Sequence, residues 1–244
     1  MRRGSLLEGH FSVLGGRVPR IVGVLVGLTL TLSILGALGG RESLLRAAGV
    51  LVPALVWSGQ LWRLVTWMFF EMEPISLLFS CLMLWWFGRD LIQAWGAGGF
   101  LGRYLAFSAL PAALTVLMSL TWTDLGMAVY SGQWAITGAL VIAWATLFPS
   151  RQLLLYFVFP LGGRNLVYIT LGTTVLFGLF YGLAGFVPHL LAESLMLAYL
   201  RGVSFQRLWL EVRYRLWWRG FRKRSSHLRA VEKDAPSQQD RWLH

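Results

Sequence analysis

The sequence predicts an all-α integral membrane protein with six transmembrane helices, an interfacial first loop and a C-terminal amphipathic basic helix. Hydrophobic residues make up 56% of the 244 residues, and charged residues only 14%. A soluble domain carries roughly 25% charged residues. Apolar stretches close to 20 residues long recur along most of the chain, and each is long enough to cross a bilayer. Together these observations exclude a soluble globular domain.

The predicted spans are separated by connections that contain proline, glycine or charged residues. They cover residues 21–38, 75–94, 104–121, 132–148, 166–186 and 188–200. The long connection 39–74 is interpreted as a structured interfacial loop, because its tryptophans alternate with charged residues such as Glu71. Residues 153–161 are apolar too, but Pro160 and the two glycines after it end this run early. We therefore expect an extended segment there and no seventh helix.

Basic residues determine the expected orientation in the membrane. They lie at both ends of the chain and in the connections 89–103 and 151–164, whereas 122–130 and 182–187 carry none. Six spans with both termini in the cytoplasm satisfy this pattern, and the three arginines of the first loop are its one exception. The compact layout, without a recognisable targeting signal, predicts a bacterial inner membrane.

The chain divides into a basic cytoplasmic segment (1–20), a membrane domain (21–202), an amphipathic interfacial helix (203–224) and a disordered tail (225–244). Half of the 22 lysines and arginines lie between residues 201 and 241. A basic segment after a membrane span more often contacts anionic lipid than nucleic acid. We therefore expect membrane lipids as partners and no nucleic acid.

Metal- and cofactor-dependent chemistry is not expected. Cys81 is the only cysteine in the chain, which excludes a disulfide framework and a cysteine-based zinc site. The sequence also contains no HExxH, phosphate-binding or dinucleotide-binding motif. The prediction is therefore a protein without metal or cofactor.

A series of short motifs over residues 59–202 resembles the rhomboid superfamily. It begins with Trp62-Arg63 in the first loop, continues with Leu-Trp-Trp-Phe-Gly ending at Gly88, and includes Phe-Pro-Ser-Arg at 148–151. Active rhomboids are six-helix intramembrane proteases with a serine–histidine dyad. Their serine lies in a Gly-x-Ser-Gly motif that opens the fourth helix, and their histidine lies in the sixth. A histidine and an asparagine, four residues apart on the second helix, help to stabilise the oxyanion.

Set against that family pattern, the catalytic positions of this chain are degenerate. Gln133 stands at the position of the nucleophile, and an amide has no hydroxyl that a base could activate. Ser76 and Ser80 stand at the positions of the two oxyanion donors. His189 lies near the expected dyad histidine. The resemblance therefore implies a rhomboid-like fold in which no catalytic dyad is intact.

The roles of five singled-out residues leave alternatives open. Ser131 could reach His189 and replace the nucleophile, or it could simply cap the fourth helix. His189 and Glu193 share one helix face and form a possible intramembrane polar site, or His189 is solvated near the interface. Trp62 and Arg63 could anchor the loop at lipid headgroups or order it internally, and these two roles are compatible.

The leading functional expectation is a pseudoprotease, similar to derlins, that binds transmembrane segments of client proteins. A sixth span only about 20 Å long would thin the bilayer locally and favour clients with polar or helix-breaking residues. One alternative is an active intramembrane serine endopeptidase with a displaced nucleophile. A second is a small transporter or channel, which the lack of an internal inverted repeat and the few charged residues within the spans disfavour.

Overall fold

The computed structural model describes four stretches of the chain, residues 10–13, 16–40, 43–155 and 159–202. The helices and strands described below belong to one compact unit, Met1–Leu200. The expected amphipathic helix (203–224) and tail (225–244) lie outside the described residues, and so do residues 1–9 of the basic N-terminal segment.

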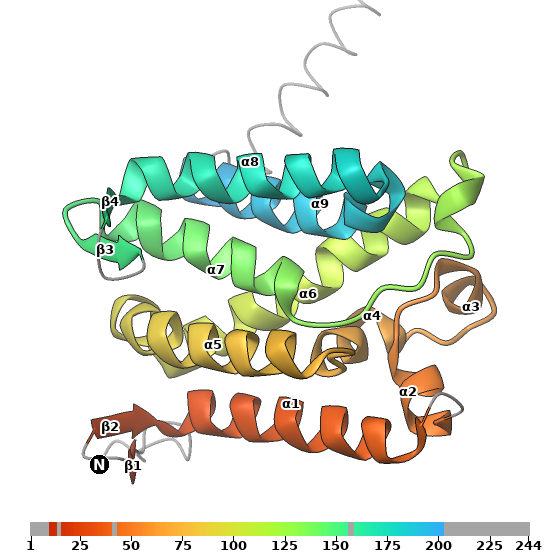
Figure 1. Ribbon diagram of the computed structural model, residues 1–244, viewed down its shortest axis with the longest axis horizontal. Coiled ribbons are helices and arrows are strands. Elements are labelled where there is room, and N and C mark those ends of the chain that lie inside the picture. The colour runs from red at the N-terminus through yellow and green to blue at the C-terminus, as the bar shows by residue number, and fades with distance from the viewer. Residues whose placement is uncertain (1–9, 14–15, 41–42, 156–158, 203–244) are drawn as a thin grey trace, which may run out of the picture. The chain divides into compact units, whose positions relative to one another are not determined.

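Six long helices occupy the positions of the six predicted spans (Figure 1). They are α1 (Arg20–Leu38), α5 (Pro74–Trp95), α6 (Ala97–Met118), α7 (Trp134–Leu147), α8 (Gly163–Tyr181) and α9 (Leu183–Leu200). Within the described residues, α1, α5, α6 and α9 are long and apolar enough to cross a membrane. Helix α7 is apolar but has only 14 residues. A mainly helical membrane fold is thus confirmed, while the count of six crossings stays a prediction.

Two glycines shift helix boundaries from their predicted positions. Gly96, with φ of 71°, turns the chain directly from α5 into α6, so α6 begins at Ala97 and not at residue 104. Gly182, with φ of 101°, ends α8 and lets α9 begin at Leu183. Both glycines have positive φ angles that other residues rarely adopt, and this is why each reversal takes a single residue.

Helix α9 accommodates a proline that was expected to begin it. Pro188 lies inside the helix and has no N–H to donate to the carbonyl four residues earlier. That carbonyl, of Ala184, instead accepts the hydroxyl of Tyr130 at 2.8 Å. Because α9 has 18 residues, it is roughly 27 Å long. The expected length of 20 Å for this span is therefore wrong, and the bilayer thinning stays a prediction.

The first loop is structured, as predicted. It contains the short helices α2 (Leu44–Gly49), α3 (Pro53–Trp57) and α4 (Arg63–Thr66), followed by the 3-10 helix η2 (Trp67–Phe69). Backbone hydrogen bonds of 2.9 Å in both directions join Leu51 of this loop to Tyr130 of the connection before α7. The loop is thereby fixed against the start of α7.

Two short antiparallel hairpins complete the described structure. β1 (His10–Val13) pairs with β2 (Gly16–Pro19), and β3 (Gln152–Leu155) pairs with β4 (Phe159–Gly162). The second hairpin confirms the extended conformation expected after α7. Both hairpins lie at the same end of the bundle as the α5–α6 turn, and α2 and α3 lie at the other end (Figure 1). The basic connections therefore share one end; that this end faces the cytoplasm stays a prediction.

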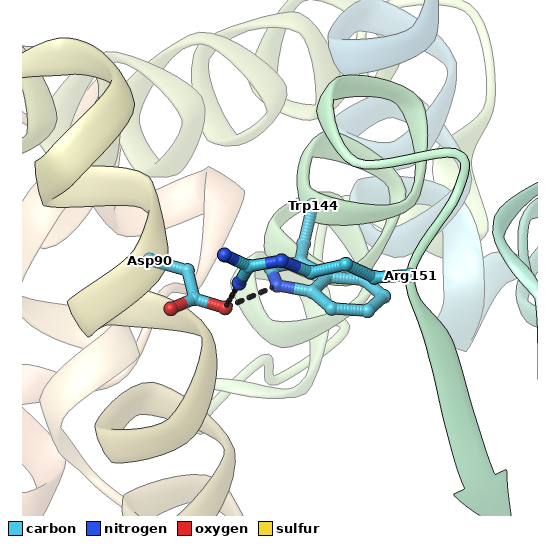
Figure 2. A network of polar contacts seen from close by, with 3 residues as sticks. All are labelled: Asp90, Trp144 and Arg151. Carbon is cyan, nitrogen blue, oxygen red and sulfur yellow. Dashed lines mark hydrogen bonds and ion pairs between the residues drawn. The ribbon is translucent and has the colours of Figure 1, made fainter.

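Helix α7 is the centre of the bundle, since ten of its 14 residues are buried and it packs against α5, α8 and α9. A polar contact fixes its C-terminal half (Figure 2). Asp90 of α5 accepts the indole N–H of Trp144 at 2.8 Å and forms an ion pair with Arg151, which precedes β3. One carboxylate therefore joins α5, α7 and the connection to the second hairpin.

Asp90→Ala is expected to lower the free energy of unfolding by about 1–3 kcal/mol, because it leaves the buried indole N–H of Trp144 without an acceptor. Arg151→Ala should cost less than about 1 kcal/mol, since an ion pair of a half-exposed arginine contributes little. Thermal unfolding of both variants in detergent measures the difference. An equal loss of unfolding free energy in the two variants would show that the ion pair with Arg151, and not the hydrogen bond from Trp144, stabilises the C-terminal half of α7.

Candidate functional site

The carboxylate of Glu71 lies between the N-termini of α5 and α7 and receives three hydrogen bonds. The hydroxyl of Ser76 donates to Oε2 at 2.8 Å, and that of Ser80 donates to Oε1 at 2.8 Å. The backbone N–H of Gln133 donates to Oε1 at 2.7 Å. Glu71 is buried, so these donors replace the water that a carboxylate would otherwise require.

The backbone around Glu71 is fixed by contacts with two distant segments. Its own N–H donates to Oγ of Ser33 on α1 at 3.0 Å, and this hydroxyl donates to the carbonyl of Phe69 at 3.0 Å. The N–H of Gly132 donates to the carbonyl of Trp67 at 3.0 Å. The first loop, α1 and the segment before α7 therefore hold the carboxylate in place together.

Gly132 leaves the space that the carboxylate fills. Its φ of 90° is a conformation that favours glycine, and a Cβ at this position would lie 2.6 Å from Oε2 of Glu71. The carboxylate also lies beside the first turns of two helices, where the helix dipole favours negative charge. Sterics and electrostatics thus both favour an acidic side chain at this point.

Gln133, the residue at the predicted nucleophile position, uses its side chain as a structural link. Its Nε2 donates to Oγ1 of Thr29 on α1 at 2.6 Å and to the hydroxyl of Tyr104 on α6 at 2.8 Å. The residue is only 1% exposed. The amide therefore joins α7 to α1 and α6 and has no free group that could attack a substrate.

The predicted histidine and the rescue serine share a cavity. His189 and Ser131 both line a cavity of about 350 Å³, together with Glu71 and Ser76. Among the described residues, no group forms a hydrogen bond with Nδ1 of His189, although this atom is buried. The structure records no hydrogen bond between Ser131 and His189. The expected N-cap role of Ser131 is also wrong, because the N-cap of α7 is Gln133, without a side-chain cap.

His189 and Glu193 do not form one joint polar site. Glu193 lines a second cavity, of about 220 Å³, which His189 does not line. Its Oε1 accepts the hydroxyl of Thr174 on α8 at 2.7 Å. The two side chains lie one helical turn apart on α9, but the cavities that they line are different.

Arg63 and Trp62 order the first loop internally. Arg63 is 4% exposed, and its Nη1 donates to the carbonyls of Ala47 at 2.7 Å and Val50 at 2.5 Å. The indole of Trp62 donates to the carbonyl of Ala48 at 3.1 Å. These acceptors are carbonyls at the C-terminal end of α2, which have no partner within the helix. The contacts of Arg63 therefore fit the internal role. Its guanidinium bonds groups of the loop and does not extend toward lipid headgroups.

The site thus contains three of the positions singled out from the sequence, Ser76, Ser80 and Gln133, around a residue that was not singled out. From the sequence, Glu71 was recognised only as one of the charged residues in the first loop. One signal was present: Glu71 directly follows the apolar run Trp67-Met68-Phe69-Phe70, and a buried charge requires several donors nearby. Thr29 and Tyr104, the partners of the Gln133 side chain, had no such signal.

The hydrogen-bond donors of this site bind an anion of the protein itself, the carboxylate of Glu71. Two hydroxyls and one backbone N–H donate to the two oxygens of the Glu71 carboxylate, much as donors surround a developing oxyanion. The arrangement therefore offers a fixed polar joint between two helices and the first loop.

Comparison with known protein families gives a match over most of the chain. A family described as "Eukaryotic integral membrane protein (DUF1751)" matches residues 20–206. The match begins at the first residue of α1 and extends past the end of α9, so it covers the whole helical bundle. No curated protein matches the chain.

Glu71→Ala is expected to destabilise the protein by more than about 2 kcal/mol, because each buried donor left unpaired costs about 1–3 kcal/mol. Adding Ser76→Ala and Ser80→Ala should recover part of this loss, since the triple variant no longer buries the two unpaired hydroxyls. Thermal unfolding in detergent measures both. The control is Glu73→Ala, an exposed acidic residue two positions away, which should change stability by less than about 0.5 kcal/mol. Strictly additive losses in the triple variant would contradict the network.

Arg63→Lys is expected to accelerate hydrogen exchange over α2 and α4 about fivefold, which corresponds to about 1 kcal/mol. A lysine cannot reproduce the fixed fork of the guanidinium that bonds two carbonyls and Gln60. Hydrogen–deuterium exchange with mass spectrometry measures the change. Arg46→Lys, on the neighbouring helix, provides the control and should leave exchange unaltered. Equal protection in Arg63→Lys and the native protein would place the role of Arg63 elsewhere.

Proposed function

Because the chain belongs to the eukaryotic integral membrane protein family DUF1751, we propose that it acts within a membrane, as a rhomboid-like pseudoprotease that binds transmembrane segments of client proteins. The family and the helices establish a multi-pass integral membrane protein. The rhomboid relationship, the loss of protease activity and the clients are parts of the proposal.

Family membership also corrects one expectation. The sequence layout predicted a bacterial inner membrane, but the matched family is described as eukaryotic. The bacterial location is therefore wrong. The compact arrangement of spans on which it was based is compatible with any membrane, since bilayers of different organelles differ in thickness by only a few ångströms.

The observation that carries the proposal is the position of the Glu71 carboxylate. If the chain is rhomboid-like, Ser76, Ser80 and the N–H of Gln133 are the groups that would stabilise an oxyanion. All three donate to Glu71 instead. A substrate carbonyl would have to displace this carboxylate, and it would then meet an amide where a nucleophile is required. The arrangement therefore disfavours both steps of the reaction, the nucleophilic attack and the stabilisation of the oxyanion.

The binding half of the proposal is supported by the surface of the bundle. Large apolar side chains are exposed along α5 and α8, including Leu78, Leu82, Leu176 and Leu179. In a membrane these side chains face lipid tails or another helix. Association of helices in lipid depends on packing and on hydrogen bonds between helices. A membrane protein that retains cavities beside exposed helices and lacks catalytic groups is suited to binding another helix.

A displaced-nucleophile protease is the second candidate, and one observation favours it. Ser131 and His189 line the same cavity, so a hydroxyl and an imidazole are exposed to a common space. A general base must come within about 2.6–3.2 Å of the proton that it removes. This candidate therefore requires two changes. Ser131 or His189 must move so that the two side chains come within hydrogen-bond distance, and the oxyanion donors must be released from Glu71.

The test is a protease assay on the purified protein in liposomes, with a fluorophosphonate probe and a generic transmembrane substrate. The native protein is expected to remain unlabelled and to leave the substrate intact. Gln133→Ser alone should also remain unlabelled, because Glu71 still accepts the N–H at position 133. Photo-crosslinking of the same substrate to the native protein should nevertheless occur.

Ser131→Ala and His189→Ala are the control variants of this assay. Labelling or cleavage by the native protein that disappears in either variant would establish the displaced-nucleophile protease and overturn the proposal. Absence of crosslinking together with absence of cleavage would contradict the client-binding part.

A further inference from the structure

A second cavity, of about 220 Å³, lies among α5, α7 and α8, with one residue of α9 in its lining. Its walls are mostly apolar, with Met83 from α5, Val141 from α7 and Leu166 from α8. Phe79 and Ile169 also line it, and they are 41% and 44% exposed on α5 and α8. The cavity therefore reaches the outer, lipid-facing surface between these two helices.

The residue from α9 in this lining is Glu193, which is 1% exposed. Only one of its two carboxyl oxygens has a partner: Oε1 accepts the hydroxyl of Thr174, and among the described residues nothing donates to the buried Oε2. An unpartnered polar atom in an apolar environment costs free energy until a donor reaches it. Glu193 lies near the middle of α9, where lipid supplies no such donor.

Two neighbouring helices position the carboxyl group of Glu193. Gly138 of α7 provides the space for it, because a side chain at that position would collide with Oε1. Thr174 holds the same oxygen from α8. Contacts from two helices thus fix the carboxyl group in the lining of the cavity.

The other polar side chains from α8 in this cavity are already satisfied within their own helix. Thr170 donates to the carbonyl of Leu166 at 2.9 Å, and Thr173 donates to that of Ile169 at 2.7 Å. Their oxygens can still accept a hydrogen bond, but neither is a buried atom without a partner. Among the described residues that line this cavity, Oε2 of Glu193 is the buried acceptor without a partner, so a ligand with a hydrogen-bond donor would satisfy it.

We propose that this cavity receives a side chain with a hydrogen-bond donor, such as threonine, from the middle of a transmembrane helix that packs against α5 and α8, and that Glu193 accepts that donor. The inference rests on the proposed binding of client helices and adds the chemistry by which they are selected. Apolar walls open to lipid suit a helix, and a fixed acceptor at mid-span suits a client with a buried donor. Purely apolar helices make the packing contacts alone.

The experiment uses the full-length protein in vesicles with two labelled peptides of about 20 apolar residues. The peptides differ only in a central threonine or valine, which have nearly the same shape. Binding is measured by energy transfer between peptide and protein. The threonine peptide is expected to bind roughly three- to thirtyfold more tightly to the native protein, the range that interhelical hydrogen bonds in membranes give.

Three variants locate the source of this preference. Glu193→Met, which keeps the length of the side chain, should bring the affinity ratio of the two peptides to about one. Thr174→Val removes the present partner of Glu193 and should increase the ratio, because both carboxyl oxygens can then accept the donor of the peptide; an unaltered ratio would count against the role of Glu193. Thr173→Val, whose hydroxyl is already bonded to its own helix, should leave the ratio unaltered. Circular dichroism of each variant verifies that it is folded. If Glu193→Met does not fold, Thr174→Val still tests the proposal.

The outcomes separate this inference from the proposed function. Binding of both peptides with equal affinity to the native protein, or a threonine preference that survives in Glu193→Met, would overturn the role of Glu193 and leave client binding intact. No binding of either peptide would overturn both. A threonine preference lost only in Glu193→Met establishes the inference.

Discussion

A carboxylate buried in an apolar helix bundle requires donors, and in this protein that requirement determines how the first loop meets the membrane domain. Glu71 is satisfied by two hydroxyls of α5 and one backbone N–H at the start of α7. These groups come from segments about 60 residues apart in the chain. Because the carboxylate needs all of them at once, it fixes the loop, α5 and α7 relative to one another. Gly132, with its positive φ and its missing side chain, makes the approach possible.

Other buried polar groups at the joints of the bundle follow the same logic. Gln133 links α7 to α1 and α6 through Thr29 and Tyr104, and Asp90 links α5 to Trp144 and Arg151 at the opposite end of α7. In lipid, an unsatisfied polar group has no water to bond, so each such group is best placed where helices must be held together. Glu193 differs from these joints, since one of its oxygens remains without a partner among the described residues. That difference marks it as a group that acts on something outside the bundle.

The sequence predicted well what depends on local pattern. The positions of six apolar helices, the structured first loop and the extended segment around Pro160 follow from hydropathy and from proline and glycine placement. The predicted helix boundaries were wrong where a single residue alters the local backbone. Gly96 and Gly182 shorten two turns, and Pro188 lies inside a helix because Tyr130, 58 positions earlier, bonds the carbonyl that the proline leaves free. Of the site, family resemblance selected Ser76, Ser80 and Gln133. The group that unites them, Glu71, depends on how a loop folds back onto the bundle, which tertiary packing decides.

The N–H of Gln133 donates to the carboxylate of Glu71, and the amide proton of Gln133 reports on this bond directly. The measurement is its chemical shift by NMR, on labelled protein in lipid nanodiscs, in the native protein, Glu71→Ala and the control Glu73→Ala. A short charge-assisted hydrogen bond of 2.7 Å predicts a strongly downfield amide proton that moves upfield in Glu71→Ala and is unaltered in Glu73→Ala. An amide shift that Glu71→Ala does not change would contradict the account, because the donors at this site would then be free for another ligand.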